Sequence, residues 1–445
     1  EIGLNTTAYA YAIVFVVRSC ICILLRTKAA DRGIGTAGCH PPVNDHNIKG
    51  RLMTDFVGNP LFASGGITIF EVMNELAQKH QAINLGQGAP DEDGPADIRE
   101  AAAKATMELS NQYPPLAGVP ELLQAVADHN KRFYGIEVDP KKEVLVSVGA
   151  TEGLANVILG LVAPGDEVIL IEPLYDSYLP IVKLAGGIPK LVRVTPPSWD
   201  LPREELAAAF SEKTKLILIN SPQNPCSKVY GDDELQFIAD LCIKHDVVAL
   251  CDEVYEHLVF DGRKHTPLMT FPGMHERTVR IGSAGKTFSL TGWKIGYVTA
   301  CAKLMEPIKK AHQFLVFTVP PALQHGVAYG LNKEDAYFEA FTAEMQGKRD
   351  FLMKGLKEVG FDVLDSQGTY FITCDFRPLG YDCDDVEFCQ IMIKEAGVVA
   401  IPVSAFYQGE DGGVRNFVRF CFCKEEAKMN EAIERMKKAF SRKVD

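Results

Sequence analysis

The sequence predicts an α/β protein with a mostly parallel, seven-stranded sheet, because short β-branched runs alternate with helical stretches between about residues 144 and 302. Apolar strands separated by helices are typical of a sheet that is covered on both faces. After about residue 303 the pattern changes to long helices, then strands and a last helix, which indicates a smaller α+β domain. We therefore expect a large domain at 91–305, followed by a linker helix and the small domain at 306–445.

Seven strand candidates belong to the large domain, and helical stretches lie between them. The strand candidates are 144–148, 167–171, 188–194, 215–220, 246–251, 278–282 and 296–300. The helical candidates are 151–162, 176–185, 203–210 and 232–245. For the small domain we expect a long helical stretch at 303–358, strands near 362–364, 370–374 and 416–422, and a last helix at 424–440.

The N-terminal region differs from the rest of the chain. Residues 8–25 are almost wholly apolar, at the short edge of the roughly 20 residues that a bilayer span needs. This run can be a membrane anchor, part of a targeting peptide or non-native sequence, so 1–50 is set apart as an N-terminal extension. Residues 51–90, with a helix inside 66–83, are expected to form an arm or part of the small domain.

The composition is that of an ordinary globular protein with an acidic balance. Hydrophobic residues make up 47% of the chain, charged residues 23%, and the formal net charge is −12. Nucleic-acid binding needs a basic face, so small anions held by a few local cations are the better expectation. None of the 12 cysteines forms a CxxC pair, although Cys20/Cys22 and Cys421/Cys423 have CxC spacing. We interpret them as buried residues of a reducing compartment and expect no metal site.

The segment 283–296, SAGKTFSLTGWKIG, contains two lysines beside a hydroxyl and glycines. A lysine amine becomes a good nucleophile only when burial or a neighbouring cation lowers its pKa, as imine chemistry with a carbonyl cofactor requires. Lys294 can supply such a cation for Lys286. The apolar residues around Lys286 make an ordinary surface loop the weaker interpretation.

Asp252 follows an apolar strand, at the place where α/β sheets bind their ligands. There its carboxylate can pair with a protonated ring nitrogen, and Tyr255 can reach an oxygen of the same ring. Taken alone, however, capping of a following helix is the more common use of such an aspartate.

Three more segments contain polar groups at strand ends or inside a strand. In 220–228, NSPQNPCSK, the prolines mark a turn, and Asn224 can donate a hydrogen bond to a ring oxygen or a carboxylate. In 149–153, GATEG, the free N–H groups of a helix start can bind a phosphate. Arg419 lies among aromatic residues on a predicted strand, and its planar fork matches a carboxylate, either of a substrate or of an internal salt bridge.

These five segments, in this order, resemble the class I and II aminotransferases of pyridoxal-phosphate (PLP) fold type I, which have the aspartate aminotransferase-like fold. The resemblance covers about residues 55–440. Further segments are similar to the branch that contains kynurenine–oxoglutarate transaminase, glutamine transaminase K and cysteine-S-conjugate β-lyase. These segments are 84–95, 111–122, 172–178, 252–262, 283–297 and 418–426.

The resemblance implies a role for each candidate residue. Lys286 matches the Schiff-base lysine that also moves the substrate proton, and Asp252 matches the partner of the ring nitrogen. Tyr255 and Asn224 match the ligands of the ring oxygen. The residues that match phosphate-binding and ring-stacking positions are Ala150, Thr151, Tyr175, Ser283 and Lys294.

The substrate and the subunit partner are implied in the same way. The positions that hold the substrate α-carboxylate are matched by Arg419, Asn224 and Gly88. Tyr113 matches a tyrosine that the neighbouring subunit contributes to the phosphate, which implies a homodimer with shared active sites.

Three positions depart from the family pattern. The usual NPTGK is NPCSK here, with Cys226 and Ser227 in place of Thr and Gly. We expect this change to alter the loop geometry without loss of the Asn224 contact. Ala89 replaces a phenylalanine near the substrate entrance, and Phe317-Thr318 stands where the branch often has Phe-His. These last two departures leave the preferred amino acid open.

The implied activity is PLP-dependent transfer of the amino group of kynurenine, Phe, Tyr, Trp, Met or Gln to a 2-oxo acid. One alternative is a β-lyase that releases pyruvate and ammonia by C–S elimination, and a remote one is a non-catalytic PLP-binding regulator. The expected location is the cytoplasm, with a mitochondrion, a plastid or a membrane contact through residues 8–25 as alternatives.

Overall fold

The computed structural model describes residues 58–59, 61, 68–409 and 413–440. The predicted extension at 1–50, with its apolar run, lies outside these residues. Among the described helices, none combines the length and the apolar character that a bilayer crossing needs. The chain from Asn59 onward forms one compact unit. The domain boundaries expected near residues 90 and 305 stay predictions.

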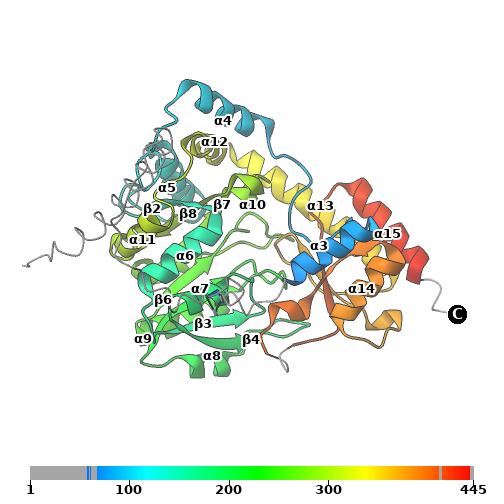
Figure 1. Ribbon diagram of the computed structural model, residues 1–445. Helices are drawn as coiled ribbons and strands as arrows, with labels where there is room; N and C mark the ends of the chain where they lie inside the picture. The colour runs from blue at the N-terminus through cyan, green and yellow to red at the C-terminus, as the bar shows by residue number, and fades with distance from the viewer. Residues whose placement is uncertain (1–57, 60, 62–67, 410–412, 441–445) are drawn as a thin grey trace, which may run out of the picture. The chain divides into compact units, whose positions relative to one another are not determined.

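A seven-stranded sheet lies inside this unit, in the order β2-β8-β7-β6-β5-β3-β4 (Figure 1). Neighbouring strands from β7 to β4 pair in parallel, and β8 runs against both β7 and β2. The predicted α/β fold with a mostly parallel sheet is thus confirmed. The strands are β2 (Val144–Val148), β3 (Glu167–Glu172), β4 (Ile188–Arg193), β5 (Thr214–Asn220), β6 (Val248–Asp252), β7 (Thr278–Ser283) and β8 (Ile295–Ala300).

Helices cover both faces of this sheet. Alternate residues of a strand point to opposite faces, so an all-apolar strand is buried on both sides. In β3, Val168 and Leu170 pack with the first face, and Ile169 and Ile171 pack with the second. The first face is covered by α6 (Gly149–Leu161), α7 (Tyr178–Leu184) and α11 (Ala302–Leu315), and the second by α8 (Arg203–Ala209) and α9 (Asp232–His245).

A further helical layer packs beside β2 and β8. It consists of α4 (Ala96–Glu108), α5 (Pro120–Tyr134) and α12 (Pro321–Leu331). Val144 and Val146 of β2 share a buried core with α5 and α12. The helices α4 and α5 were not predicted.

The C-terminal part has its own four-stranded antiparallel sheet, in the order β12-β13-β10-β9. The helix expected inside 66–83 forms as α3 and contacts α14. The strand after α3, β1, pairs in parallel with β11. The elements of this part are α3 (Ile69–His80), β1 (Ile83–Asn84), α13 (Asp335–Val359), β9 (Asp362–Val363), β10 (Phe371–Asp375), α14 (Asp385–Ala396), β11 (Val398–Val399), β12 (Ile401–Pro402), β13 (Phe417–Cys421) and α15 (Glu426–Phe440).

The single helical stretch predicted at 303–358 is wrong. The chain forms three helices there, α11, α12 and α13, with breaks after Leu315 and after Leu331. The first break contains Phe317, whose φ of 69° is left-handed, and Pro320, and α12 begins at the adjacent Pro321. Two consecutive prolines lack two backbone N–H donors and disfavour helical residues before them, which explains why one helix ends before Pro320 and a new one starts at Pro321.

Candidate active site

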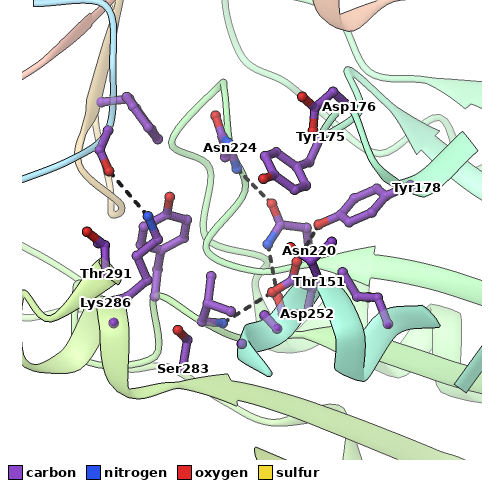
Figure 2. A pocket seen from close by; sticks show the side chains of 18 of the residues that line it. Thr151, Tyr175, Asp176, Tyr178, Asn220, Asn224, Asp252, Ser283, Lys286 and Thr291 are labelled. Carbon is purple, nitrogen blue, oxygen red and sulfur yellow. Dashed lines mark hydrogen bonds between the residues drawn. The ribbon is translucent and has the colours of Figure 1, made fainter. Parts of the chain in front are cut away.

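Turns from separate strands meet at one edge of the seven-stranded sheet. The carboxyl ends of β2, β3, β5, β6 and β7 lie at this edge, and so does the beginning of the antiparallel β8. Side chains from these turns project into a common cavity of about 340 Å³ (Figure 2). All predicted site residues except Tyr113 line it, namely Gly88, Ala150, Thr151, Tyr175, Asn224, Asp252, Tyr255, Ser283, Lys286, Lys294 and Arg419.

Lys286 lies in the short helix α10 (Ala284–Thr287), directly after β7. Its Nζ donates a 3.2 Å hydrogen bond to the carbonyl oxygen of Gly88 (Figure 2). The same Nζ lies 5.6 Å from the ring centres of both Tyr255 and Tyr370. Burial in this setting lowers the pKa of the Lys286 amine, because it disfavours the charged form. The amine is therefore suited to act as a nucleophile.

Asp252 is the last residue of β6 and only 4% of its surface is exposed. Burial raises the pKa of its carboxyl to about 6, although the Tyr178 hydroxyl donates a 2.6 Å hydrogen bond to Oδ2 and acts in the opposite direction. No helix begins after Asp252, where the chain forms a turn, so the helix-capping alternative is wrong. A buried carboxylate of this kind gains from a cationic partner such as a protonated ring nitrogen.

The turn between β2 and α6 is shaped to hold an anion. Helix α6 begins at Gly149, whose φ is +68°. A β-carbon added there would lie 3.1 Å from the Nζ of Lys294, and one added at Gly296 would lie 2.6 Å from the carbonyl carbon of Gly149. These glycines let the start of the helix approach the lysine closely. The free N–H groups of the helix start, the Ser283 hydroxyl and the Lys294 ammonium form a donor set that suits a phosphate.

Arg419 lies on β13 and is 2% exposed. Its guanidinium carbon lies 3.8 Å from the ring centre of Phe371, and Nη1 and Nη2 donate 2.7 Å hydrogen bonds to Asn224 Oδ1 and to the Gly86 carbonyl oxygen. Within the described part of the chain, Nε has no hydrogen-bond partner and no carboxylate forms a salt bridge with this arginine. The internal salt bridge that the sequence left open is thus not found there, and a substrate carboxylate would fill this role.

Some predicted positions lie outside the cavity. Tyr113 is 82% exposed, and its ring packs edge-to-face on Phe317 at 5.3 Å between centres. Ala89 and Thr318 are likewise absent from the cavity wall. A single chain therefore does not bring these three positions to the site.

The NPCSK turn keeps Asn224 in the cavity. Its backbone N–H donates a 2.8 Å hydrogen bond to the Asn220 side-chain oxygen. Ser227 has a left-handed φ of 61°, which explains why glycine is usual at this position. Its hydroxyl donates a 2.7 Å hydrogen bond to the Phe371 carbonyl oxygen, so the serine is anchored despite its backbone conformation.

A buried ionic cluster, formed by Arg280, Glu253 and Glu256, lies behind the turn that contains Asp252. Arg280, on β7, reaches Glu253 at 2.6 Å and Glu256 at 3.3 Å. Two histidines border it, His129 and His257, with their Nε2 atoms 2.8 Å apart. Glu256 and the two histidines have the spacing of metal ligands, but Glu256 pairs with Arg280 and the histidines are hydrogen-bonded to each other. The cluster ties the turn after β6 to the strand that leads to Lys286.

Sequence reasoning did not identify this cluster or Tyr178, Asn220, Phe70 and Phe371 as parts of the site. Tyr178 is the last residue of the segment 172–178, but only the position of α7 relative to β6 directs its hydroxyl to Asp252. Phe70 and Phe371 come from other elements, α3 and β10, and also line the cavity.

The residues present fit pyridoxal phosphate. Its aldehyde, its ring nitrogen and its phosphate each find a matching group in the cavity: the amine of Lys286, the buried carboxylate of Asp252, and the donor set around Gly149. The glycines at 149 and 296 provide the close backbone approach that the phosphate site needs.

Comparisons with known proteins agree with this geometry. The family model "Aminotransferase class I and II" matches residues 80–436. The chain is 45% identical to the probable N-succinyldiaminopimelate aminotransferase DapC of Mycobacterium tuberculosis, over 83% of this chain and 95% of the relative. The solved structure of the N-succinyldiaminopimelate aminotransferase from that organism has a TM-score of 0.83 at 44% identity and covers 86% of this chain and 100% of that one.

Two other relatives carry the names of a methionine aminotransferase and a kynurenine–oxoglutarate transaminase. The methionine aminotransferase of Escherichia coli is 40% identical over 84% of this chain and 96% of its own length. Kynurenine–oxoglutarate transaminase 3 of Homo sapiens is 39% identical over 82% of this chain and 86% of its own length.

Proposed function

The chain belongs to the class I and II aminotransferases, and on that premise we propose that it transfers the amino group of an apolar or aromatic amino acid to a 2-oxo acid. It is a PLP-dependent enzyme that acts on amino acids and 2-oxo acids. The observation that carries the proposed substrate class is the lining of the described cavity, where Arg419 is the cation left for a substrate and Phe70 and Phe371 stand beside it.

The cavity wall favours a donor with one carboxylate and an uncharged side chain. The cationic residues that line it are Lys286, Lys294 and Arg419. The first two face the predicted cofactor, which leaves Arg419 as the cation for a substrate carboxylate. Phe70 and Phe371, also on the wall, offer apolar contacts to the donor side chain. The names of two relatives, methionine aminotransferase and kynurenine–oxoglutarate transaminase, agree with such donors.

Lys286 is the base in the proposed reaction. When bound, PLP supplies an electron sink that stabilises the negative charge developing on the substrate α-carbon. The Lys286 amine, with a pKa lowered by burial, takes the proton from that carbon and later returns a proton. Its hydrogen bond to the Gly88 carbonyl keeps Nζ on the side of the cavity where the substrate carboxylate is expected.

Asp252 and Arg419 position the reacting groups. The Asp252 carboxylate would pair with the ring nitrogen of bound PLP and favour its protonated form, and the Tyr178 hydroxyl holds that carboxylate in place. The Arg419 guanidinium, braced by Asn224 and the Gly86 carbonyl, orients the α-carboxylate of the substrate. Tyr255 lines the same cavity, with its ring centre 5.6 Å from Lys286 Nζ.

We also propose that the enzyme works as a homodimer that shares its active sites. Tyr113 is exposed on the single chain, in contact with Phe317, and large apolar side chains such as Met107 and Phe314 are exposed too. Exposed apolar residues of this size are typical of a subunit interface. A second copy would cover them and bring its Tyr113 toward the phosphate.

A panel of amino donors tests the proposed function. The PLP-loaded enzyme is mixed with Met, Phe, Tyr, Trp, Gln or kynurenine, and the loss of the absorbance band of lysine-bound PLP is followed. We expect apolar and aromatic donors to react faster than aspartate by at least about tenfold, since the described cavity wall has Arg419 for the α-carboxylate and no second cation there for the side-chain carboxylate of aspartate. Faster reaction with aspartate or with a diaminopimelate derivative would contradict the proposed substrate class.

Two controls complete this test. A Lys286→Ala variant should lack both the band and the turnover, whereas Lys303→Ala, an exposed lysine on α11, should behave like the wild type. Pyruvate formed from a cysteine conjugate without added 2-oxo acid would reveal C–S elimination, an alternative that the comparisons do not support.

A further inference from the structure

Two thiols of β13 and its extension lie in contact beside the active site. The Sγ atoms of Cys421 and Cys423 are 3.1 Å apart, and the two residues are 0% and 2% exposed. Residues two apart on an extended chain point to the same side, so both thiols lie on the side from which Arg419 enters the cavity. Both are close enough to Lys286 to influence its pKa. The proposed transamination uses neither thiol.

The segment that contains this thiol pair is bonded to the active-site wall. The N–H of Cys421 donates a 2.6 Å hydrogen bond to the Leu85 carbonyl oxygen, and Lys424 Nζ donates one of the same length to the Ala89 carbonyl oxygen. Between these two acceptors lies Gly88, whose carbonyl accepts the hydrogen bond from Lys286. A movement of residues 421–424 would therefore displace the strip of chain that faces the reactive lysine.

A second connection leads to Lys286 from the other side. The N–H of Phe422 donates a 2.9 Å hydrogen bond to the Tyr370 carbonyl oxygen. The Tyr370 hydroxyl in turn donates a 2.7 Å hydrogen bond to the backbone carbonyl of Lys286. Hydrogen bonds thus connect the segment of the thiol pair both to the chain around Gly88, whose carbonyl accepts from Lys286, and to the backbone of Lys286 itself.

We propose that Cys421 and Cys423 form a reversible disulfide that switches the enzyme to a less active state. The oxidant is hydrogen peroxide. The Cys421 thiolate attacks one peroxide oxygen, the O–O bond breaks, and Cys421 becomes a sulfenic acid while the departing hydroxide takes up a proton to form water. The Cys423 thiol then attacks the Cys421 sulfur, the S–O bond breaks, and the departing hydroxide takes the thiol proton and leaves as a second water. Two thiols are oxidised, and one peroxide is reduced to two waters.

The surroundings of Cys421 favour its thiolate. Burial acts to raise the pKa of this thiol, but the hydrogen bond from the Cys423 thiol and the cations of Lys424 and Arg419 outweigh it and hold the pKa below its ordinary value. Closing the disulfide draws the two sulfurs from 3.1 Å to the bonded distance of about 2.05 Å. A bond across so short a ring is strained, and strained disulfides are reduced readily, as a reversible switch requires.

Mass spectrometry tests the proposal independently of catalysis. The PLP-loaded enzyme is treated with hydrogen peroxide, the smallest hydroperoxide, and the remaining thiols are then alkylated. Trypsin cuts after Arg419 and Lys424, so the peptide FCFCK (420–424) contains both cysteines and no other. We expect this peptide to lack alkyl groups and to weigh two hydrogens less than the dithiol, and dithiothreitol to reverse the change.

The rate of amino transfer from the best donor should fall with the same time course, by about tenfold. A displacement of the reacting groups by about 1 Å can lower the rate of the reaction up to 100-fold. This second readout rests on the proposed function, and the peptide mass does not. If untreated enzyme transfers no amino group, the proposed function fails while the peptide mass still decides whether the disulfide forms.

Matched variants separate this pair from the other cysteines. Cys423→Val and Cys423→Ser should keep their activity in peroxide, and Cys301→Ser, a half-buried cysteine on the surface, should lose activity as the wild type does. The proposal is overturned if the 420–424 peptide stays a dithiol under conditions that oxidise Cys301. It is equally overturned if both Cys423 variants lose activity as fast as the wild type.

Discussion

The Tyr178 hydroxyl donates a 2.6 Å hydrogen bond to Oδ2 of Asp252, and this bond joins the first turn of α7 to the end of β6. It favours the ionised form of a carboxyl that burial would otherwise keep protonated. The pairing of Asp252 with a protonated ring nitrogen therefore depends in part on a tyrosine from a different strand connection.

Replacing this tyrosine tests that dependence. Tyr178→Phe should raise the pKa of Asp252 above about 6 and weaken PLP binding at pH 7 by about tenfold, since a hydrogen bond to a charged group contributes roughly 1.5 kcal/mol or more. The deficit should shrink at pH 9, where the carboxyl ionises without help. Titrating apoenzyme with PLP at both pH values measures this, with Tyr407→Phe, a buried tyrosine elsewhere, as control. Equal affinities at pH 7 would refute the expectation.

Asp252 should also leave a signature in the stability of the apoenzyme. Its pKa of about 6 in the folded chain lies above the ordinary value of 3.8, so the folded state retains a proton that the unfolded state has released between those values. Stability should then fall as the pH rises from about 4 to above 6. With 1.36 kcal/mol per pKa unit, the loss is about 3 kcal/mol.

The isosteric variant Asp252→Asn has no carboxyl at this position and should not show this loss. As the pH rises from about 4 to above 6, the unfolding free energy of the variant apoprotein should therefore increase relative to that of the wild-type apoprotein. Denaturant unfolding at pH 4 and pH 8 measures it. A difference that does not depend on pH would contradict the raised pKa.

Arg419 should be sensitive even to a conservative change. Arg419→Lys keeps the charge but loses the planar fork that stacks on Phe371 and bonds Asn224 and the Gly86 carbonyl. We expect kcat/KM for the amino donor to fall about 100-fold, mostly through KM, because a bidentate contact to the α-carboxylate is lost. The absorbance band of lysine-bound PLP should remain. A variant with unchanged KM would exclude a carboxylate-binding role.

Ser227 allows two opposing effects to be separated. Ser227→Gly removes a strained left-handed residue, which gains about 1 kcal/mol, but loses a buried hydrogen bond of similar value, so stability should change little. Ser227→Ala keeps the strain and loses the bond, and should destabilise the protein by about 1–2 kcal/mol. Denaturant midpoints compare the two, and an alanine variant as stable as the glycine one would contradict this account.

Tyr113 tests the shared active site. If a second copy brings this residue to the phosphate, light scattering should give twice the mass of one chain, and Tyr113→Phe, which loses only the hydroxyl, should bind PLP about tenfold less tightly. Its assembly should be unchanged, because the exposed ring against Phe317 is retained. A monomer with full PLP affinity would refute the proposed dimer.

The sequence was sufficient to predict the large sheet and the strand ends where most of the candidate site residues lie. All seven strands form close to the predicted β-branched runs. Both faces of this sheet are buried, so most of its strands are apolar runs that can be recognised from their own residues. Because Asp252 and the GATEG turn each follow a predicted strand, the sequence also placed them at the carboxyl ends of the strands. The prediction failed for 303–358, where helical composition on both sides of Pro320-Pro321 concealed two breaks in the helix.

What the sequence could not give are contacts between distant segments. The bond between Tyr178 and Asp252 joins residues 74 positions apart, and the stacking of Arg419 on Phe371 depends on the pairing of β13 with β10. The sequence analysis assigned no role to Arg280 and its two glutamates, and only the fold reveals that they pair with one another. Local patterns do not encode such pairings.

The buried ionic cluster around Arg280 implies that the site should respond to salt in two different ways. The side chains of Arg280, Glu253 and Glu256 are 6%, 3% and 2% exposed, so dissolved ions cannot screen their attraction. Lys294, in contrast, is exposed, and its attraction for an incoming phosphate is open to screening. Rising ionic strength should therefore slow the capture of PLP by the apoenzyme while leaving the turn that contains Asp252 in place, so that enzyme already loaded with PLP keeps its turnover in concentrated salt.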